Sequence, residues 1–314
     1  MAFRYIDPGY GALTGDTSVE TFENTTYNPA NGVSFRKLGT SSQNEMKIIT
    51  PQAFTTDIYG KFNLYFDSTG NFSSFSIGGF PTNTSATFFE TSGIGVNSWN
   101  NYFYLYDSGQ RIGTGIPIKK KSLNSIWFHL HKDDEQKITS GELIVNDTDV
   151  TINSDMRYRS FSSEPFFYIS FPKYNGQYIY LSEIIISDQY ISQKENIIDL
   201  PIISSETNMA VGTSGVYIAN VANQMLLQSI SVSSLVESEE NLAITGISII
   251  NHAYKIGAGL ANLTALSKIG GSVVEHDTIA LSGNSNDIIL DSWGLSSIAI
   301  NELQNMQFGW KVRA

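Results

Sequence analysis

Two histidines separated by a single residue are the side chains whose types and spacing come nearest to chemistry. His129 and His131 fall in residues 125–131, an aromatic and apolar run that predicts a strand. Side chains two positions apart on a strand point to the same face, so both imidazoles could bind one metal ion with Asp133 or Asp134. No third histidine or cysteine stands at a useful spacing, and the polar face of a half-exposed strand explains the pair more simply. We therefore predict a structural role for this pair and no metal site.

Carboxylates elsewhere in the chain raise calcium binding and sugar hydrolysis as further chemistry. Asp147 and Asp149 lie in a turn, as do the acidic residues 133–135, but no Asp-x-Asp-x-Asp-Gly run accompanies them, which favours solvated turns. A glycosidase needs two carboxylates held across the sugar, whereas Glu183 is isolated on its strand and Asp188 stands at the end of that strand. The four histidines are scattered and no Gly-x-Ser-x-Gly sequence is present. We predict no catalytic residue, no cofactor and no enzymatic activity.

The best binding candidate surrounds a tryptophan. Trp99 is accompanied by Asn97, Asn101 and Tyr102. An exposed indole stacks on the apolar face of a sugar, and amide side chains bond to its hydroxyl groups. We predict these four residues to bind carbohydrate, while a buried aromatic at a strand start is the alternative for Trp99. The basic run at residues 119–121 could meet an acidic polysaccharide, although a solvated turn is its default explanation.

The elements that must position these residues are predicted to be strands almost throughout. The chain has 26 glycines and 12% aromatic residues, and helical spacing of apolar residues is scarce. Residues 177–191 predict the strand that completes the first domain, and its consecutive residues Ile184, Ile185 and Ile186 indicate burial on both faces. Residues 61–66 alternate as a half-buried strand does. Residues 296–305 predict one short helix with a hydroxyl N-cap.

Length and composition narrow the class of protein. The 314 residues allow two domains, which we place at 1–200 and 201–314 as two β-sandwiches, the second one smaller. Cysteine is absent, so the chain has no disulfide bonds. The net charge is −11, with 15 Lys and Arg residues before residue 201 and 4 after it, and this balance disfavours binding to nucleic acid. The N-terminus lacks the apolar core of a signal peptide. The uncharged residues 207–236 are too polar for membrane insertion.

The middle of the first domain resembles the concanavalin A-like, laminin-G-like jelly roll. The resemblance lies in the tryptophan-containing run 125–131, the charged turn 132–137 and the strand-like run 141–147, with the strand at 180–188 completing the sheet. It covers roughly residues 1–195. Domains of this family bind glycans, host enzymes or fill structural roles, so the resemblance implies a fold rather than a function.

The C-terminus is similar to the ending of many tailed-bacteriophage virion proteins. The matching runs are residues 291–295 (DSWGL), 300–304 (INELQ) and 308–312 (FGWKV). Leu295 and Trp310 depart from the usual pattern, and they leave open which virion component it is. The resemblance implies a non-enzymatic, fibre- or appendage-type structural protein, assembled in the host cytoplasm with other virion proteins. Its expected partners are further copies of itself, with a trimer favoured, and a host-surface glycan. The alternatives are a capsid decoration protein, a free lectin and a polysaccharide-degrading enzyme.

Overall fold

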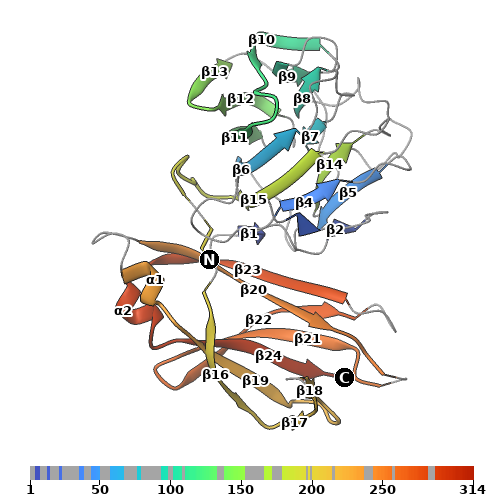
Figure 1. Ribbon diagram of the computed structural model, residues 1–314, viewed down its shortest axis with the longest axis vertical. Helices are drawn as coiled ribbons and strands as arrows, with labels where there is room; N and C mark the ends of the chain where they lie inside the picture. Colours follow the sequence, from blue (N-terminus) through green and yellow to red (C-terminus); the bar gives the residue numbers. More distant parts are fainter. Residues whose placement is uncertain are drawn as a thin grey trace. The chain divides into compact units, whose positions relative to one another are not determined.

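The structure of the chain is a computed structural model, and strands dominate it (Figure 1). It describes residues 4–7, 13–14, 21–22, 35–38, 44–49, 57–66, 76–78, 93–97, 102–107, 110–132, 138–152, 166–171, 179–195, 197–198, 200–213, 216–236, 243–256, 259–281 and 287–314. The chain divides into two compact units, residues 2–198 and residues 199–314 with Met1. We call them the N-terminal unit and the C-terminal unit. The predicted all-β fold is confirmed.

Two antiparallel sheets build the N-terminal unit (Figure 1). The first sheet runs in the order β13 (Thr148–Ile152), β12 (Ile138–Val145), β11 (Leu123–Lys132), β6 (Asp57–Phe66), β15 (Ile179–Ser187), β4 (Phe35–Leu38) and β3 (Thr21–Phe22), with β1 (Arg4–Asp7) also paired to β15. The second sheet runs in the order β10 (Gln110–Pro117), β9 (Tyr102–Asp107), β8 (Gly93–Asn97), β7 (Ser76–Gly78), β14 (Phe166–Phe171), β5 (Asn44–Ile49) and β2 (Leu13–Thr14). Central neighbours such as β6 and β15 are far apart in sequence, as Greek-key connections require.

Alternate residues of four strands of the first sheet, β12, β11, β6 and β15, make its inner, apolar face. Gly60 lies directly opposite Phe128 there, and a Cβ on Gly60 would come within 2.1 Å of the Phe128 ring. Phe62 meets the same ring edge-on, with centroids 6.3 Å apart. Buried side chains from the second sheet include Phe103 and Ile116. The inner-face residues exposed by at most 1% are Ile58, Phe62, Leu64, Ile126, Phe128, Leu130, Leu143, Val145 and Ile186.

The opposite, outer face of the first sheet is covered by the segment that follows β15. We call this segment, residues 188–198, the strap. Its Ile191 and Ile197 are buried against side chains of the outer face, and the Trp127 indole N–H donates to the Ile191 carbonyl at 2.9 Å. The outer-face members of this cluster are Ile6, Trp127, Ile144 and Ile185, with Tyr59 packed against them. The part of the first sheet that lies under the strap is therefore buried on both sides.

Burial by the strap corrects one prediction and explains another. Residues 61–65 are not half-exposed, because Lys61 and Asn63 on the outer face are only 4% and 5% exposed, while the burial of Phe66 lies outside what the structure describes. The predicted burial of β15 on both faces is confirmed, with residues 184–186 at most 3% exposed. A bulge helps: Ser182 pairs with Asn63 and Ile185 with Lys61, so β15 carries one extra residue.

The C-terminal unit contains a five-stranded antiparallel sheet and a separate two-stranded sheet. The larger sheet has the order β16 (Ile202–Thr207), β19 (Met225–Ile230), β24 (Gln307–Arg313), β21 (Asn262–Ile269) and β22 (Ser272–Ala280). The smaller pairs β20 (Ile244–Ala253) with β23 (Asp287–Ile298), and β17 (Ala210–Val211) pairs with β18 (Tyr217–Ile218). Trp293 of β23 reaches Phe308 of β24, with ring centroids 6.3 Å apart, so the two sheets share a core.

Two four-residue helices occur in the described part of this unit, one more than predicted. The predicted helix is α2 (Ile300–Leu303), and α1 (Ser233–Val236) is additional. The hydroxyl N-cap is wrong: β23 continues to Ile298 and the N-cap is Ala299, whose N–H donates to Glu302 at 3.2 Å. Leu303 anchors α2, being 2% exposed. Among the residues described, no helix has the length and apolarity to cross a membrane.

Candidate functional site

The residues predicted to bind carbohydrate lie at one end of the β8–β9 hairpin. Asn97 ends β8 and Tyr102 begins β9, and the two are direct cross-strand partners. Tyr102 is half-buried and the next residue, Phe103, is fully buried, so the core fixes the start of β9. Trp99 and Asn101 fall outside the described residues. The register thus brings Asn97 and Tyr102 together, and the role of all four residues stays a prediction.

A second group of polar side chains lies on the outer face of the first sheet. His129 and His131 point to one side of β11, as predicted, and both contact the same oxygen of Asp57 on β6. His129 Nε2 is 2.7 Å and His131 Nδ1 is 2.9 Å from Asp57 Oδ1. Asp57 is the direct cross-strand partner of His131. The carboxylate at the histidines is therefore Asp57, while Asp133 and Asp134 lie outside the described residues.

Aromatic rings border this cluster. Tyr59 stacks on the His129 ring, with centroids 4.2 Å apart and planes 6° apart. Tyr190 of the strap meets Tyr59 edge-on at 5.8 Å. Partial burial raises the pKa of Tyr59, and the negative charges of Asp57 and Glu142 raise it further. The cluster is thus a compact, negatively charged and partly exposed patch.

A buried ionic network lies under the strap. Glu183 is 5% exposed, and its carboxylate accepts a hydrogen bond from the Asn63 amide. Burial raises the pKa of Glu183, and the positive charge of Lys61 opposes this rise. Burial lowers the pKa of Lys61, while Glu183 and Glu195 raise it, and Lys61 Nζ donates to the Glu195 carbonyl. Glu183 has φ of +51°, so the strained bulge places its carboxylate beside these partners. The only carboxylate on the closing strand is thus engaged in the core.

The C-terminal unit brings a serine and a histidine together. Ser267 Oγ and His276 Nε2 are 2.8 Å apart, although no sequence pattern pointed to the pair. Ser267 is only 3% exposed, and Trp293 stacks on His276 with centroids 3.8 Å apart. Burial lowers the pKa of His276. Because the hydroxyl is buried and the imidazole is covered by an indole, the pair fastens β22 to β21 and β23 rather than offering a nucleophile.

Asp291 is a buried carboxylate near this pair. It is 5% exposed; its Oδ1 accepts the Ser292 N–H at 2.9 Å, and its buried Oδ2 has no hydrogen-bond partner among the residues that the structure describes. Burial raises the pKa of Asp291 to about 7, and the charge of Asp277 adds to this rise. Hydrogen bonds from the backbone of Ser292 and Asp277 oppose it. Folding therefore places a proton-binding group inside the C-terminal unit.

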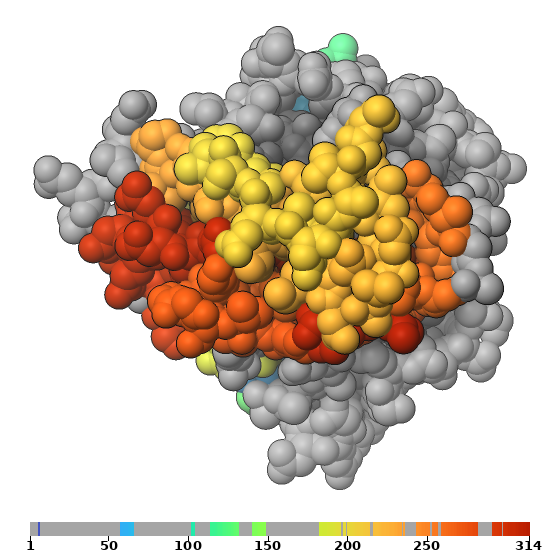
Figure 2. All heavy atoms as spheres, turned by 90° about the horizontal axis from the view of Figure 1, so that it is seen from below, coloured from blue at the N-terminus to red at the C-terminus, as the bar shows by residue number. Residues whose placement is uncertain are grey.

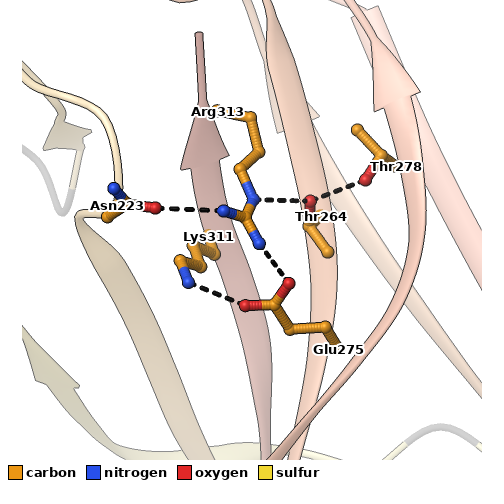
Figure 3. Close-up of polar contacts among 6 residues, drawn as sticks. All are labelled: Asn223, Thr264, Glu275, Thr278, Lys311 and Arg313. Atoms are coloured by element: carbon orange, nitrogen blue, oxygen red, sulfur yellow. Dashed lines mark hydrogen bonds and ion pairs between the residues drawn. The ribbon is translucent and has the colours of Figure 1, made fainter.

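The end of the chain is held by an exposed ionic cluster (Figure 3). Glu275 of β22 contacts Lys311 at 2.7 Å and also Arg313, both on β24. The hydrogen bond from Lys311 lowers the pKa of Glu275, as does Arg313. Arg313 also donates to Asn223 at 3.1 Å and to Thr264 at 3.4 Å (Figure 3). The lysine of the C-terminal sequence pattern thus ties the last strand to its sheet.

Comparison with known proteins finds only distant similarity to solved structures. No protein-family model matches the chain, and no curated protein matches it. A protein of unknown function from Shewanella oneidensis covers 60% of this chain and 85% of its own, at 10% identity and a TM-score of 0.42. The GalNAc-bound lectin from Bauhinia forficata covers 60% of this chain and 98% of its own, at 12% identity and a TM-score of 0.38. Alginate lyase Aly36B, in complex with an alginate trisaccharide, covers 59% of this chain and 97% of its own, at 11% identity and a TM-score of 0.36. The chain is an all-β protein whose N-terminal unit contains two antiparallel sheets, and such distant similarity does not transfer a function.

Proposed function

We propose that the protein is a non-enzymatic structural subunit of a tailed-bacteriophage particle, associated with the tail or its fibres, that attaches to a glycan on the host surface. Assignment to a phage rests on the C-terminal sequence pattern. Its runs 291–295, 300–304 and 308–312 fall on β23, α2 and β24, and Trp293, Leu303 and Trp310 are each at most 6% exposed. The pattern therefore corresponds to the core of one folded unit.

The edge strand β16 is the observation that supports assembly of the protein with other chains. It is exposed along its length, with Ile202 at 56% and Ile203 at 66% (yellow surface in Figure 2). An exposed edge strand, here one that begins with two exposed isoleucines, invites pairing with another chain, and proteins that stay monomeric protect such edges. Val211 and Val221 add exposed apolar surface in the following segment, at 67% and 61%. These features support a subunit that is completed by further copies or by other virion proteins.

The non-enzymatic part of the proposal is supported by what the buried ionisable groups do. Glu183 is engaged by Asn63 and held beside the charge of Lys61, and Ser267 and His276 bond to each other in the interior. Attachment is assigned to the β8–β9 hairpin end, where Asn97 and Tyr102 pair next to the predicted Trp99.

Three measurements test the proposal. Purified particles probed with an antibody should carry the protein at the tail or fibres, and the purified chain should have the mass of a homo-oligomer, with a trimer expected. On a panel of host-surface polysaccharides, Trp99→Ala and Tyr102→Ala should each weaken binding about tenfold, because one ring–sugar contact is lost. Tyr190→Ala, which removes a 67% exposed aromatic elsewhere in the unit, is the matched control.

Different failures overturn different parts. A monomer absent from particles overturns the virion role, and labelling of the head lattice moves the protein to capsid decoration. Binding that survives both hairpin variants moves the glycan site elsewhere. Release of reducing ends from a polysaccharide contradicts the non-enzymatic assignment.

A further inference from the structure

We propose that Asp57, His129 and His131 form a binding site for one divalent transition-metal ion such as Zn²⁺. The proposal concerns the outer face of the first sheet and is independent of glycan attachment. Its basis is convergence: the two imidazoles, which come from one strand, and the carboxylate from the neighbouring strand direct their ligand atoms at a common point. All three ligand atoms lie within 4.8 Å of one another.

The separations fit a metal site without its ion. Ligands at about 2.0–2.1 Å from a tetrahedral ion lie roughly 3.3 Å apart. Here Asp57 Oδ1 is 2.7 Å from His129 Nε2 and 2.9 Å from His131 Nδ1. Side-chain rotations that open these contacts by about half an ångström admit the ion. Each contact is a hydrogen bond between an imidazole nitrogen and the carboxylate, and a bound metal ion would replace both, with each neutral imidazole carrying its proton on the other ring nitrogen.

The strands hold the three ligands in place. His131 is the direct cross-strand partner of Asp57, and His129 is the partner of Tyr59. The inner face behind them is fully packed, since Ile58, Phe128 and Leu130 are at most 1% exposed. Tyr59 stacks on His129 and restricts the orientation of its ring. Ligands fixed on two central strands need little reorganisation on binding.

Access and ligand type define the ion. The side chains are 25% (His129), 45% (His131) and 27% (Asp57) exposed, so an ion can enter from solvent and keep open coordination positions. Two imidazole nitrogens and one carboxylate suit Zn²⁺, Co²⁺ or Ni²⁺, whereas Ca²⁺ and Mg²⁺ prefer oxygen ligands. Glu142, the cross-strand partner of His129 on its other side, adds negative charge beside the site. The open positions can be taken by water or by an oxygen ligand.

The test is metal binding by the full-length chain without an affinity tag. Zn²⁺ titrated by calorimetry, with bound metal counted after dialysis, should give one high-affinity ion per chain. Co²⁺ should give the visible spectrum of a low-symmetry site with nitrogen ligands. Asp57→Asn, His129→Gln and His131→Gln should each weaken Zn²⁺ binding at least tenfold. Excess Mg²⁺ or Ca²⁺ should not compete.

A matched control is His252→Gln, which removes a histidine of the C-terminal unit and should leave binding unchanged. Circular dichroism shows that each variant is folded; a misfolded variant is replaced by His131→Asn, which alters the least buried ligand. Absence of stoichiometric Zn²⁺ binding overturns the proposal. So does binding that survives substitution of all three residues, or equal loss in the His252→Gln control. With any of these three results, the three side chains form only a hydrogen-bonded cluster.

Discussion

Replacing Asp291 with asparagine measures how far the buried carboxylate lowers the free energy of unfolding of the C-terminal unit. Burial raises the pKa of Asp291 from its ordinary 3.8 to about 7. Between these values the folded chain keeps a proton that the unfolded chain releases. The stability from this group is therefore complete below pH about 4 and is lost as the pH rises towards about 7. The asparagine side chain in Asp291→Asn has nearly the same shape and no charge, so this variant does not lose stability from this position as the pH rises.

The magnitude follows from linkage. Each pKa unit corresponds to about 1.4 kcal/mol. With pKa values of 3.8 and about 7, the wild-type chain loses about 1 kcal/mol at pH about 4.5 and about 4 kcal/mol at pH about 7.5. The free energy of unfolding of Asp291→Asn, relative to wild type, should rise by about 3 kcal/mol between these two conditions. The buried amide also needs a partner where Oδ2 has none, but this pH-independent cost cancels in the comparison.

Urea unfolding of the full chain at both pH values provides the assay. Hydrogen exchange in peptides from β20 to β24 assigns the change to the C-terminal unit. Asp147→Asn is the control, because Asp147 is exposed in a turn at φ +65°, a conformation that asparagine also adopts. A stability difference between Asp291→Asn and wild type that is the same at both pH values would refute the reasoning.

Two further substitutions test the cores. Lys61→Met should destabilise the N-terminal unit by about 3–5 kcal/mol near neutral pH, since it leaves the Glu183 carboxylate buried beside Asn63 alone. The loss should shrink on acidification because the pKa of Glu183 is already raised, and Lys61→Met/Glu183→Gln should recover most of it in urea melts. An unchanged midpoint in the single variant would contradict the buried pair. Gly309→Ala should cost about 3 kcal/mol or more, since its Cβ would lie 1.8 Å from the Leu226 carbonyl oxygen on the adjacent strand. Calorimetry measures this loss, and a wild-type melting temperature would show that β24 can move away from β19.

Local patterns in the sequence were enough to predict strands, the burial of β15 and the position of α2. Three consecutive isoleucines indicate a strand without a solvent face, and residues 184–186 are indeed buried on both sides. Alternation at residues 61–66 predicts a solvent-exposed face that includes Lys61 and Asn63, but both are buried. Lys61 donates to Glu195 of the strap and Asn63 to Glu183 of β15, and nothing in the polar sequence of residues 192–195 indicates that Ile191 and Ile197 are buried.

The candidate metal site shows the limit of reading spacing alone. The pair His129 and His131 was visible because strand geometry is local. Asp57 lies 72 residues before His129, and the pairing register of β6 with β11 alone brings it opposite His131. That register depends on how Phe62 and Phe128 fill the inner core, which is a property of the whole sandwich. Spacing along the chain therefore could not point to Asp57, and the expectation for Asp133 and Asp134 stays a prediction.

The strap also determines how the N-terminal unit bears mechanical load. A pull on residue 198 away from the sandwich is expected to act first on Ile197, then on the hydrogen bond from Lys61 to the Glu195 carbonyl, and then on the Trp127–Ile191 hydrogen bond. The strap lies on the sheet and is not one of its paired strands, so we expect these contacts to break before the hydrogen bonds between β15 and its neighbours. Each released residue would add up to about 3.5 Å of extended chain.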